Sequence, residues 1–131
     1  MNNNKTKKSG DGIIMNKSFE KLFEGIDMDF KSIDERFAGN EKIILKFIKK
    51  FEKDETFSKL EKAVNEYNKE AMIVYSHDLK GLSANLGMKK LSSLSNDMLS
   101  ELRNNIFSNI PMRFNSIKKE YINVIQCIKK I

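Results

Sequence analysis

The 131-residue sequence has no tryptophan, one cysteine, one proline and six glycines. Because Cys127 is the only cysteine, no internal disulfide or thiolate metal site is expected, as is usual in a reducing compartment. Its spacing from apolar neighbours predicts a core position. The scarcity of proline and glycine leaves long stretches without helix-breaking residues, so helix is the default prediction.

Long hydrophobic runs are also missing. The N-terminal region offers only Ile13, Ile14 and Met15 in a row, far fewer than a signal peptide needs. No stretch approaches the roughly 20 apolar residues that span a bilayer. We therefore expect a soluble, cytoplasmic protein without direct membrane insertion.

The net charge is +6, from 24 Lys and Arg against 18 Asp and Glu. Such a balance favours acidic partners, which include nucleic acid, an anionic membrane and an acidic protein cleft. It also fits a surface whose charge only aids solubility. The lack of Trp and the small number of Tyr, three, argue weakly against a nucleic-acid binder.

The length allows one domain, which we place at residues 13–131. Residues 1–12 are polar and have no hydrophobic period, so they are predicted to be a flexible tail or the end of a linker. Two short apolar clusters at helical spacing follow between Phe19 and Phe37, separated by Gly25. The second cluster predicts the firmer helix, which starts after Asp27 or Asp29 and ends at Gly39.

The segment 40–67 is predicted to be helical, with Asn40 as its N-cap. Its first half carries one apolar set and its second half another, about half a turn out of phase at ~100° per residue. We infer a kink or short break near Asp54 to Thr56, and a straight helix that presents opposite faces to two partners is the alternative. The two sets are Ile43, Ile44, Phe47, Ile48, Phe51 and then Phe57, Leu60, Val64, Tyr67.

Three further helices are predicted from apolar residues spaced by three and four. One covers residues 69–86 and ends at Gly87, the next runs through Leu102, and the last begins near Pro111. The predicted fold is all-α: an antiparallel four-helix bundle with one or two short additional N-terminal helices. The apolar positions are Met72, Tyr75, Leu79, Leu82 and Leu86, then Met88, Leu91, Leu94, Met98 and Leu102, and finally Phe114, Ile117, Tyr121, Val124, Ile128 and Ile131.

The only histidine, His77, lies nearly opposite the predicted core side of the 69–86 helix. On the same outward face are Lys80, Gly81, Ala84 and Ile73, with Val74 beside them. Glycine in the middle of a helix costs about 1 kcal/mol relative to alanine, so Gly81 needs a reason.

Two interpretations of this face remain. In the first, His77 is an ordinary surface histidine and Gly81 accommodates internal packing. In the second, the face is a chemical site, because imidazole, with an ordinary pKa near ~6.5, is a nucleophile that can attack phosphorus. Lys80 would stabilise the charge of a transferred group, and Gly81 would let another protein approach closely. A zinc site or a Ser–His nucleophile lacks the additional residues it needs here.

The string from His77 to Gly87, HDLKGLSANLG, resembles the signature of histidine phosphotransfer domains, H-x-L-K-G with a further Gly six residues later. The resemblance extends over about residues 27–105. The segment Arg36-Phe37-Ala38-Gly39-Asn40, followed by Ile44, Leu45, Phe47, Ile48 and Phe51, is similar to the family's entry into its long second helix.

The resemblance implies that His77 is the phosphoacceptor, through Nε2, that Lys80 stabilises the phosphate and that Gly81 gives the partner clearance. Leu79 and Gly87 would be structural. The partners would be response-regulator receiver domains, together with a hybrid sensor histidine kinase, in a two-component phosphorelay. The receiver's aspartate and Mg²⁺ would perform the catalysis, so the chain would be a phosphocarrier without a cofactor and not an enzyme.

A docking surface formed by Ile73, Val74 and Ala84 is expected around His77, on a monomer that binds no nucleic acid. Two other functions remain as alternatives. One is a non-catalytic helical adaptor that uses the same surface. The other is a phosphoacceptor domain served directly by a chemotaxis-type histidine kinase.

Overall fold

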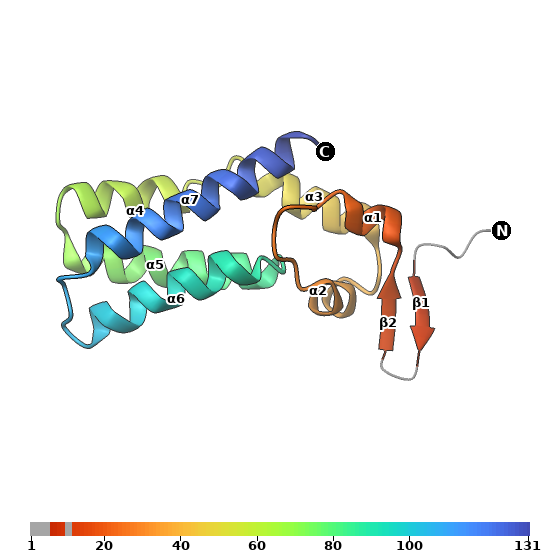
Figure 1. Ribbon diagram of the computed structural model, residues 1–131, viewed down its shortest axis with the longest axis horizontal. Coiled ribbons are helices and arrows are strands. Elements are labelled where there is room, and N and C mark those ends of the chain that lie inside the picture. Colours follow the sequence, from red (N-terminus) through yellow and green to blue (C-terminus); the bar gives the residue numbers. More distant parts are fainter. Residues whose placement is uncertain (1–5, 10–11) are drawn as a thin grey trace.

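The computed structural model describes residues 6–9 and 12–131. Seven α-helices make up most of this part of the chain, and a two-stranded hairpin precedes them (Figure 1). The helices are α1 (Lys17–Lys21), α2 (Phe30–Arg36), α3 (Glu41–Phe51), α4 (Thr56–Asn65), α5 (Lys69–Asn85), α6 (Lys89–Arg103) and α7 (Ile110–Lys129). The predicted all-α fold, a four-helix bundle with one or two short additional N-terminal helices, is confirmed.

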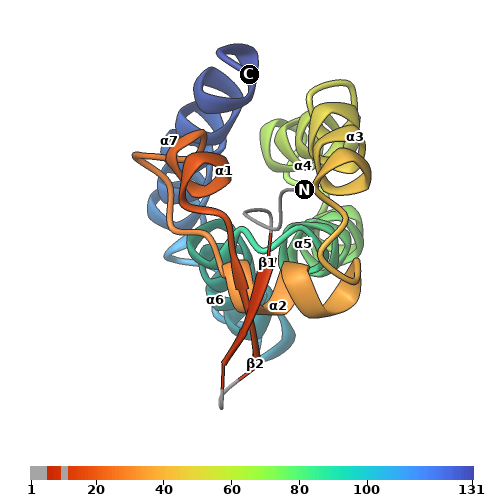
Figure 2. The same ribbon diagram turned by 90° about the vertical axis from the view of Figure 1, so that its right-hand side faces the viewer.

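Helices α4, α5, α6 and α7 form the four-helix bundle, and each contacts two of the others to close a ring (Figure 2). Helix α3 continues the column of α4 beyond the bundle, while α1 and α2 lie at the same end as α3 (Figure 1). The predicted break between the two halves of the 40–67 segment is confirmed, because α3 ends at Phe51 and α4 begins at Thr56. The Asp54 carboxylate accepts a hydrogen bond from the Thr56 amide at 2.8 Å within this break.

Local capping signals explain where several helices begin. The side chains of Asp29, Asn40 and Asn68 accept hydrogen bonds from backbone amides in the first turns of α2, α3 and α5. Gly39 and Gly87 follow the ends of α2 and α5 with φ of +71° and +74°. Gly87 ends α5 where the sequence predicts, whereas α2 ends at Arg36, before the predicted Gly39, because Ala38 already has a left-handed φ of +52°.

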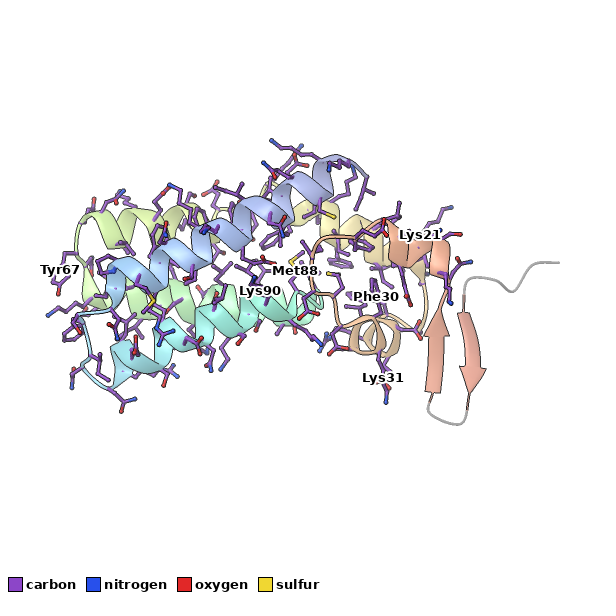
Figure 3. All side chains as sticks on the ribbon, in the orientation of Figure 1. Lys21, Phe30, Lys31, Tyr67, Met88 and Lys90 are labelled. Atoms are coloured by element: carbon purple, nitrogen blue, oxygen red, sulfur yellow. The ribbon has the colours of Figure 1, made fainter. Side chains whose placement is uncertain are left out.

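The N-terminal segment joins the bundle through backbone contacts. The Asp29 amide donates to the Gly87 carbonyl at 2.7 Å, and the Lys89 amide donates to the Asp27 carbonyl at 3.1 Å. Met28 and Met88 form an isolated antiparallel bridge between these two bonds, and both side chains are buried. Figure 3 shows Met88 at this junction, with Phe30 on the neighbouring α2. The start of α2 is therefore held against the turn between α5 and α6.

Part of the segment predicted to be a flexible tail is a strand. Strand β1 (Thr6–Ser9) pairs antiparallel with β2 (Gly12–Met15), in a register that places Thr6 opposite Met15. Residues 1–5 and 10–11 lie outside the described residues. The tail was predicted because residues 1–12 have no hydrophobic period, but antiparallel pairing uses backbone hydrogen bonds and does not require one. β2 packs beside α2.

Two apolar residues predicted on the core side of α3 are exposed instead. Ile44, Ile48 and Phe51 are buried, whereas Ile43 and Phe47 are 41% and 42% exposed. At ~100° per residue the five positions span an arc of roughly 140°, and the neighbouring elements cover only the side with the three buried residues. Ile43 and Phe47 are left at the uncovered edge.

Tyr67 also differs from the prediction. It was grouped with the apolar face of α4, but α4 ends at Asn65 and Tyr67 has a φ of +51° in the turn that follows. Its side chain is 55% exposed, at the end of the bundle away from α1 and α2 (Figure 3). The turn takes the ring out of the helical period, so the spacing was misleading there.

The remaining predicted core positions of α6 and α7 are buried or half-buried. Cys127 is buried as predicted, and its thiol donates to the Leu22 carbonyl at 3.2 Å. No helix in the described part of the chain is both long and apolar enough to cross a membrane.

Candidate functional site

The site is built on α5, a helix of 17 residues. It begins after Asn68, whose side chain accepts the Ala71 amide at 3.1 Å, and it closes with a bond from the Met88 amide to the Ser83 carbonyl at 2.9 Å. Both ends are thus defined by specific bonds. His77 lies near the middle of α5, between these two ends.

The buried side of α5 is partly made of serine. Ser76 and Ser83 are both 0% exposed, and their hydroxyls donate to the carbonyls four residues earlier, Met72 and Leu79, at 2.6 Å. These internal bonds satisfy the hydroxyls, so the small side chains can be buried without a loss of hydrogen bonding. They also let a neighbouring helix approach closely.

That neighbour is α6, with which α5 makes its most extensive contact. The Ser92 hydroxyl donates across this interface to the Lys80 carbonyl at 2.9 Å. This packing corrects the predicted core side of α5: Met72, Leu79 and Leu86 are buried as expected, but Tyr75 and Leu82 are only half-buried. The buried arc is rotated toward the serines because α6 packs on that side.

The His77 side chain is 60% exposed and projects from the side of α5 opposite the core. Its Nδ1 lies 3.8 Å from Oδ1 of Asp78, which is longer than a hydrogen bond. No described residue forms a hydrogen bond with the ring. The imidazole is therefore open to an incoming molecule, with a carboxylate near Nδ1 only.

Lys80 lies one turn after His77 and is half-buried. Its backbone is fixed through its carbonyl, which accepts hydrogen bonds from Ser92 and, at 3.2 Å, from Ser83. Among the residues that the structure describes, none forms an ion pair with its ammonium group. The backbone of Lys80 is thus fixed, and its ammonium group has no ion-pair partner among the described residues.

Gly81 is exposed, and a Cβ atom built on it would meet no atom of the rest of the protein within 4 Å. Internal packing therefore does not explain this glycine. Gly87 differs sharply, since a Cβ there would lie 2.8 Å from the Ile33 side chain and 3.1 Å from the Asp29 carbonyl, at a positive φ. Gly87 is therefore required by the backbone conformation and by close packing, whereas neither requires Gly81.

The predicted docking residues lie around His77 on the same helix. Val74 is 52% exposed, Ala84 is exposed and Ile73 is half-buried. The structure therefore brings all six predicted site residues, from Ile73 to Ala84, onto one side of α5, where the spacing placed them.

Arg36, the last residue of α2, was not predicted as a site residue but lies beside this surface. The Arg36 guanidinium donates to the Asn85 carbonyl at 3.0 Å, which attaches the end of α2 to the end of α5. The next residue, Phe37, has its ring 5.5 Å from that of the exposed Phe47. No local signal predicted the Arg36 contact, because it joins positions 49 residues apart.

Comparisons with known proteins find little at the level of sequence. No family model matches the chain, and no curated protein matches it. A solved structure does match: the histidine-containing phosphotransfer protein B of Pseudomonas aeruginosa PAO1, with a TM-score of 0.65 and 18% sequence identity. The match covers 79% of this chain and 92% of that chain.

The fold is shared with a histidine phosphotransfer protein. At 18% identity the likeness establishes the architecture of the helical bundle. The chemistry has to be argued from the residues of this chain.

Proposed function

We propose that this chain is a histidine phosphotransfer domain, which accepts a phosphoryl group on His77 from a receiver-domain aspartate and passes it to another receiver. The observation that carries the proposal is the combination on one face of α5: an exposed imidazole, an unneutralised Lys80 and a glycine with open space where a side chain would be. The shared fold with a phosphotransfer protein supports it.

The proposed step is a transfer between an oxygen and a nitrogen. The lone pair of the neutral His77 ring attacks phosphorus, the N–P bond forms, and the P–O bond to the partner's aspartate breaks and returns a carboxylate. Asp78 carries a carboxylate 3.8 Å from Nδ1, which favours the ring proton at Nδ1 and leaves Nε2 as the nucleophile. The reverse sequence delivers the phosphoryl group to the next receiver.

Lys80 would bind the oxygens of the transferred group, whose negative charge it offsets as the N–P bond forms. Gly81 would allow the receiver's active site to approach the ring without a collision. Val74, Ile73 and Ala84 would supply apolar contact around it. The proposal places Mg²⁺ in the partner receiver, leaves this chain as a phosphocarrier and not an enzyme, and locates the relay in the cytoplasm.

The test is transfer from a phosphorylated receiver domain to the purified chain. We expect acid-labile phosphate on the wild-type protein, since an N–P bond hydrolyses in acid, and none on His77→Gln. Lys119→Ala, which changes an exposed lysine on α7, is the matched control and should be labelled like the wild type. Retention of acid-labile phosphate by His77→Gln would refute the site.

A non-catalytic adaptor would use the same exposed Val74 and Ala84 surface. Such a protein would bind its partner with His77 replaced and would never be phosphorylated. A phosphoacceptor served directly by a chemotaxis-type kinase would be labelled by that kinase and ATP in the absence of any receiver. The same phosphorylation assay, run with either donor, separates the three functions.

A further inference from the structure

A surface pocket of about 420 Å³ lies where α2, α5 and α6 meet, beside the site on α5. Its lining includes the cations Arg36, Lys80 and Lys89, and the uncharged polar residues Ser92, Ser93 and Asn96. These residues come from positions up to 60 apart in the chain, so only the fold gathers them. The proposed phosphotransfer step uses Lys80 alone among them.

The charge of this pocket is unbalanced. Asp29 is the single acidic residue in the lining, and its Oδ1 already accepts the Ser32 amide at 3.1 Å as the N-cap of α2. Arg36 donates to a neutral carbonyl, that of Asn85, so this bond leaves its positive charge uncompensated. Three cations therefore face one carboxylate, so the charge of the lining is net positive.

Among the described residues, Lys89 has one ionic contact, to Asp27 at 3.7 Å. Both side chains are more than half exposed, and exposed pairs of this length contribute little. Lys89 also opens α6, a helix of 15 residues with no side-chain cap at its N-terminus. The positive end of that helix dipole adds to the charge of the three side chains.

The pocket is continuous with the face that carries His77. Lys80 and Ala84 belong both to its lining and to the outward surface of α5. A partner that docks over His77 would therefore cover the pocket as well. Any group that this partner places there must suit a positively charged, hydrogen-bonding environment.

We infer that the pocket receives an acidic side chain of the partner receiver, and that this contact helps to determine which receivers bind. The inference rests on the proposed phosphotransfer function. A carboxylate fits the pocket because Arg36 and Lys89 offer charge-assisted hydrogen bonds and Ser93 and Asn96 offer neutral ones.

The contact would act on docking and not on the chemical step. Removing the charge of Arg36 or Lys89 should raise the receiver concentration that gives half-maximal transfer and leave the rate at saturation unchanged. Lys80→Ala should instead lower the rate at saturation. This difference separates a binding pocket from the transfer machinery.

The experiment uses the full chain and the receiver domain that labels it best among those encoded in the same genome. That receiver is held in its active form with beryllium fluoride, and its Kd is measured for the wild type, Lys89→Ala and Arg36→Glu. Lys119→Ala and Arg103→Ala, which alter exposed cations on other surfaces, are the controls. Lys89→Ala removes no hydrogen bond of the Lys89 side chain within the described structure, so it tests the pocket without a folding defect.

We expect a Kd about 3 to 10 times higher for Lys89→Ala and at least about 10 times higher for Arg36→Glu, with a weaker dependence on salt, and no change for the controls. Kd values equal to those of the controls, with transfer to wild-type His77 intact, would overturn the pocket inference alone. Failure of every receiver to label the wild type would refute the proposed function and this inference with it. Inorganic phosphate at millimolar concentration should compete for the pocket. A receiver Kd that rises in phosphate for the wild type, but not for Lys89→Ala or Arg36→Glu, would support an anion site in the pocket.

Discussion

Gly81 lies one helical turn after His77 on the exposed face of α5, and a Cβ atom on Gly81 would meet nothing within 4 Å. Packing within the protein thus does not require this glycine, although it lowers the stability of the helix. Gly81 destabilises the helix and lies next to an exposed nucleophile. Such a residue is expected where another molecule must approach closely. This relationship gives the first prediction.

Gly81→Ala should stabilise the protein by about 0.5 to 1 kcal/mol, because alanine is the better helix former and has room here. A larger helix former, as in Gly81→Gln, should keep the stability at or above that of the wild type and weaken receiver binding by about tenfold or more. Urea denaturation and receiver titration measure the two effects. Wild-type affinity in Gly81→Gln would contradict the clearance role.

The matched control is Gly87→Ala. At a φ of +74° and 2.8 Å from the Ile33 side chain, a methyl group there is both strained and crowded. We expect a loss of about 1 to 3 kcal/mol of stability. Opposite signs of the two Gly→Ala changes would establish that the glycines serve different purposes.

Lys80→Ala should slow phosphotransfer about tenfold or more at saturating receiver, since the variant lacks the cation that offsets the phosphoryl charge. Its circular dichroism and thermal midpoint should stay close to those of the wild type, because the bonds to Ser83 and Ser92 use the backbone carbonyl. Lys80→Arg should recover part of the rate. An unchanged rate in the alanine variant would show that the lysine has no part in transfer.

Asp34 is a buried carboxyl whose two oxygens have no hydrogen-bond partner among the described residues. Burial, and then the neighbouring charge of Glu35, raises its pKa above the ordinary 3.8. The folded state therefore favours the protonated form, so stability is fully present below pH 3.8 and is lost as pH rises through the raised pKa.

Asp34→Asn removes this dependence and should stabilise the protein at neutral pH by on the order of 1 kcal/mol. The gain should disappear as the pH is lowered below 3.8, where Asp34 is protonated in both states. Thermal melts across this range provide the measurement. A variant that is less stable than the wild type at neutral pH would mean that Asp34 forms a favourable interaction.

Glu101 joins the end of α6 to the start of α7. Its carboxyl pKa is shifted in the direction opposite to that of Asp34. Hydrogen bonds from Arg113 at 2.8 Å and from Asn109 at 2.9 Å lower its pKa below the ordinary 4.5. Its contribution is therefore present above pH 4.5 and is lost as pH falls through the lowered pKa.

Arg113→Gln should lower the thermal midpoint at neutral pH, and the difference from the wild type should shrink as pH falls below 4.5. Lys119→Gln removes a positive charge from the same helix without breaking an ion pair of the described residues, and it should leave the midpoint unchanged. A difference that persists undiminished in acid would assign the effect of Arg113 to packing instead.

The helix boundaries were predictable because the signals for them are local. Asn40 and Asn68 cap the next turn of their own chain, and Gly39 and Gly87 adopt conformations that other residues avoid. The break between α3 and α4 followed from a change in apolar phase. Each of these signals lies within a few residues of the structure that it predicts.

The rotation of the helices was not predictable in the same way. Ser76 and Ser83 are buried, and Tyr75 is not fully so, because α6 lies against one side of α5. A helical wheel of α5 carries no information on where its neighbour packs. The exposure of Phe47 has the same origin, since it depends on which elements cover α3.

The candidate site likewise has a part that local spacing predicts and a part that depends on how the helices pack. His77, Lys80 and Gly81 belong to one continuous motif, so their common face could be inferred from spacing. The pocket formed by Arg36, Lys80 and Lys89 could not, because α2 and the start of α6 are brought together by backbone bonds such as that from Asp29 to Gly87.

The most direct test of the account is to locate the phosphoryl group after transfer from a phosphorylated receiver. Tandem mass spectrometry of peptides prepared at neutral to alkaline pH, where phosphohistidine survives, identifies the modified residue. We expect phosphate on the peptide that contains His77, at the imidazole and at no other residue. Phosphate on a different side chain, or an unmodified His77 after exposure to every receiver of the same genome, would contradict it.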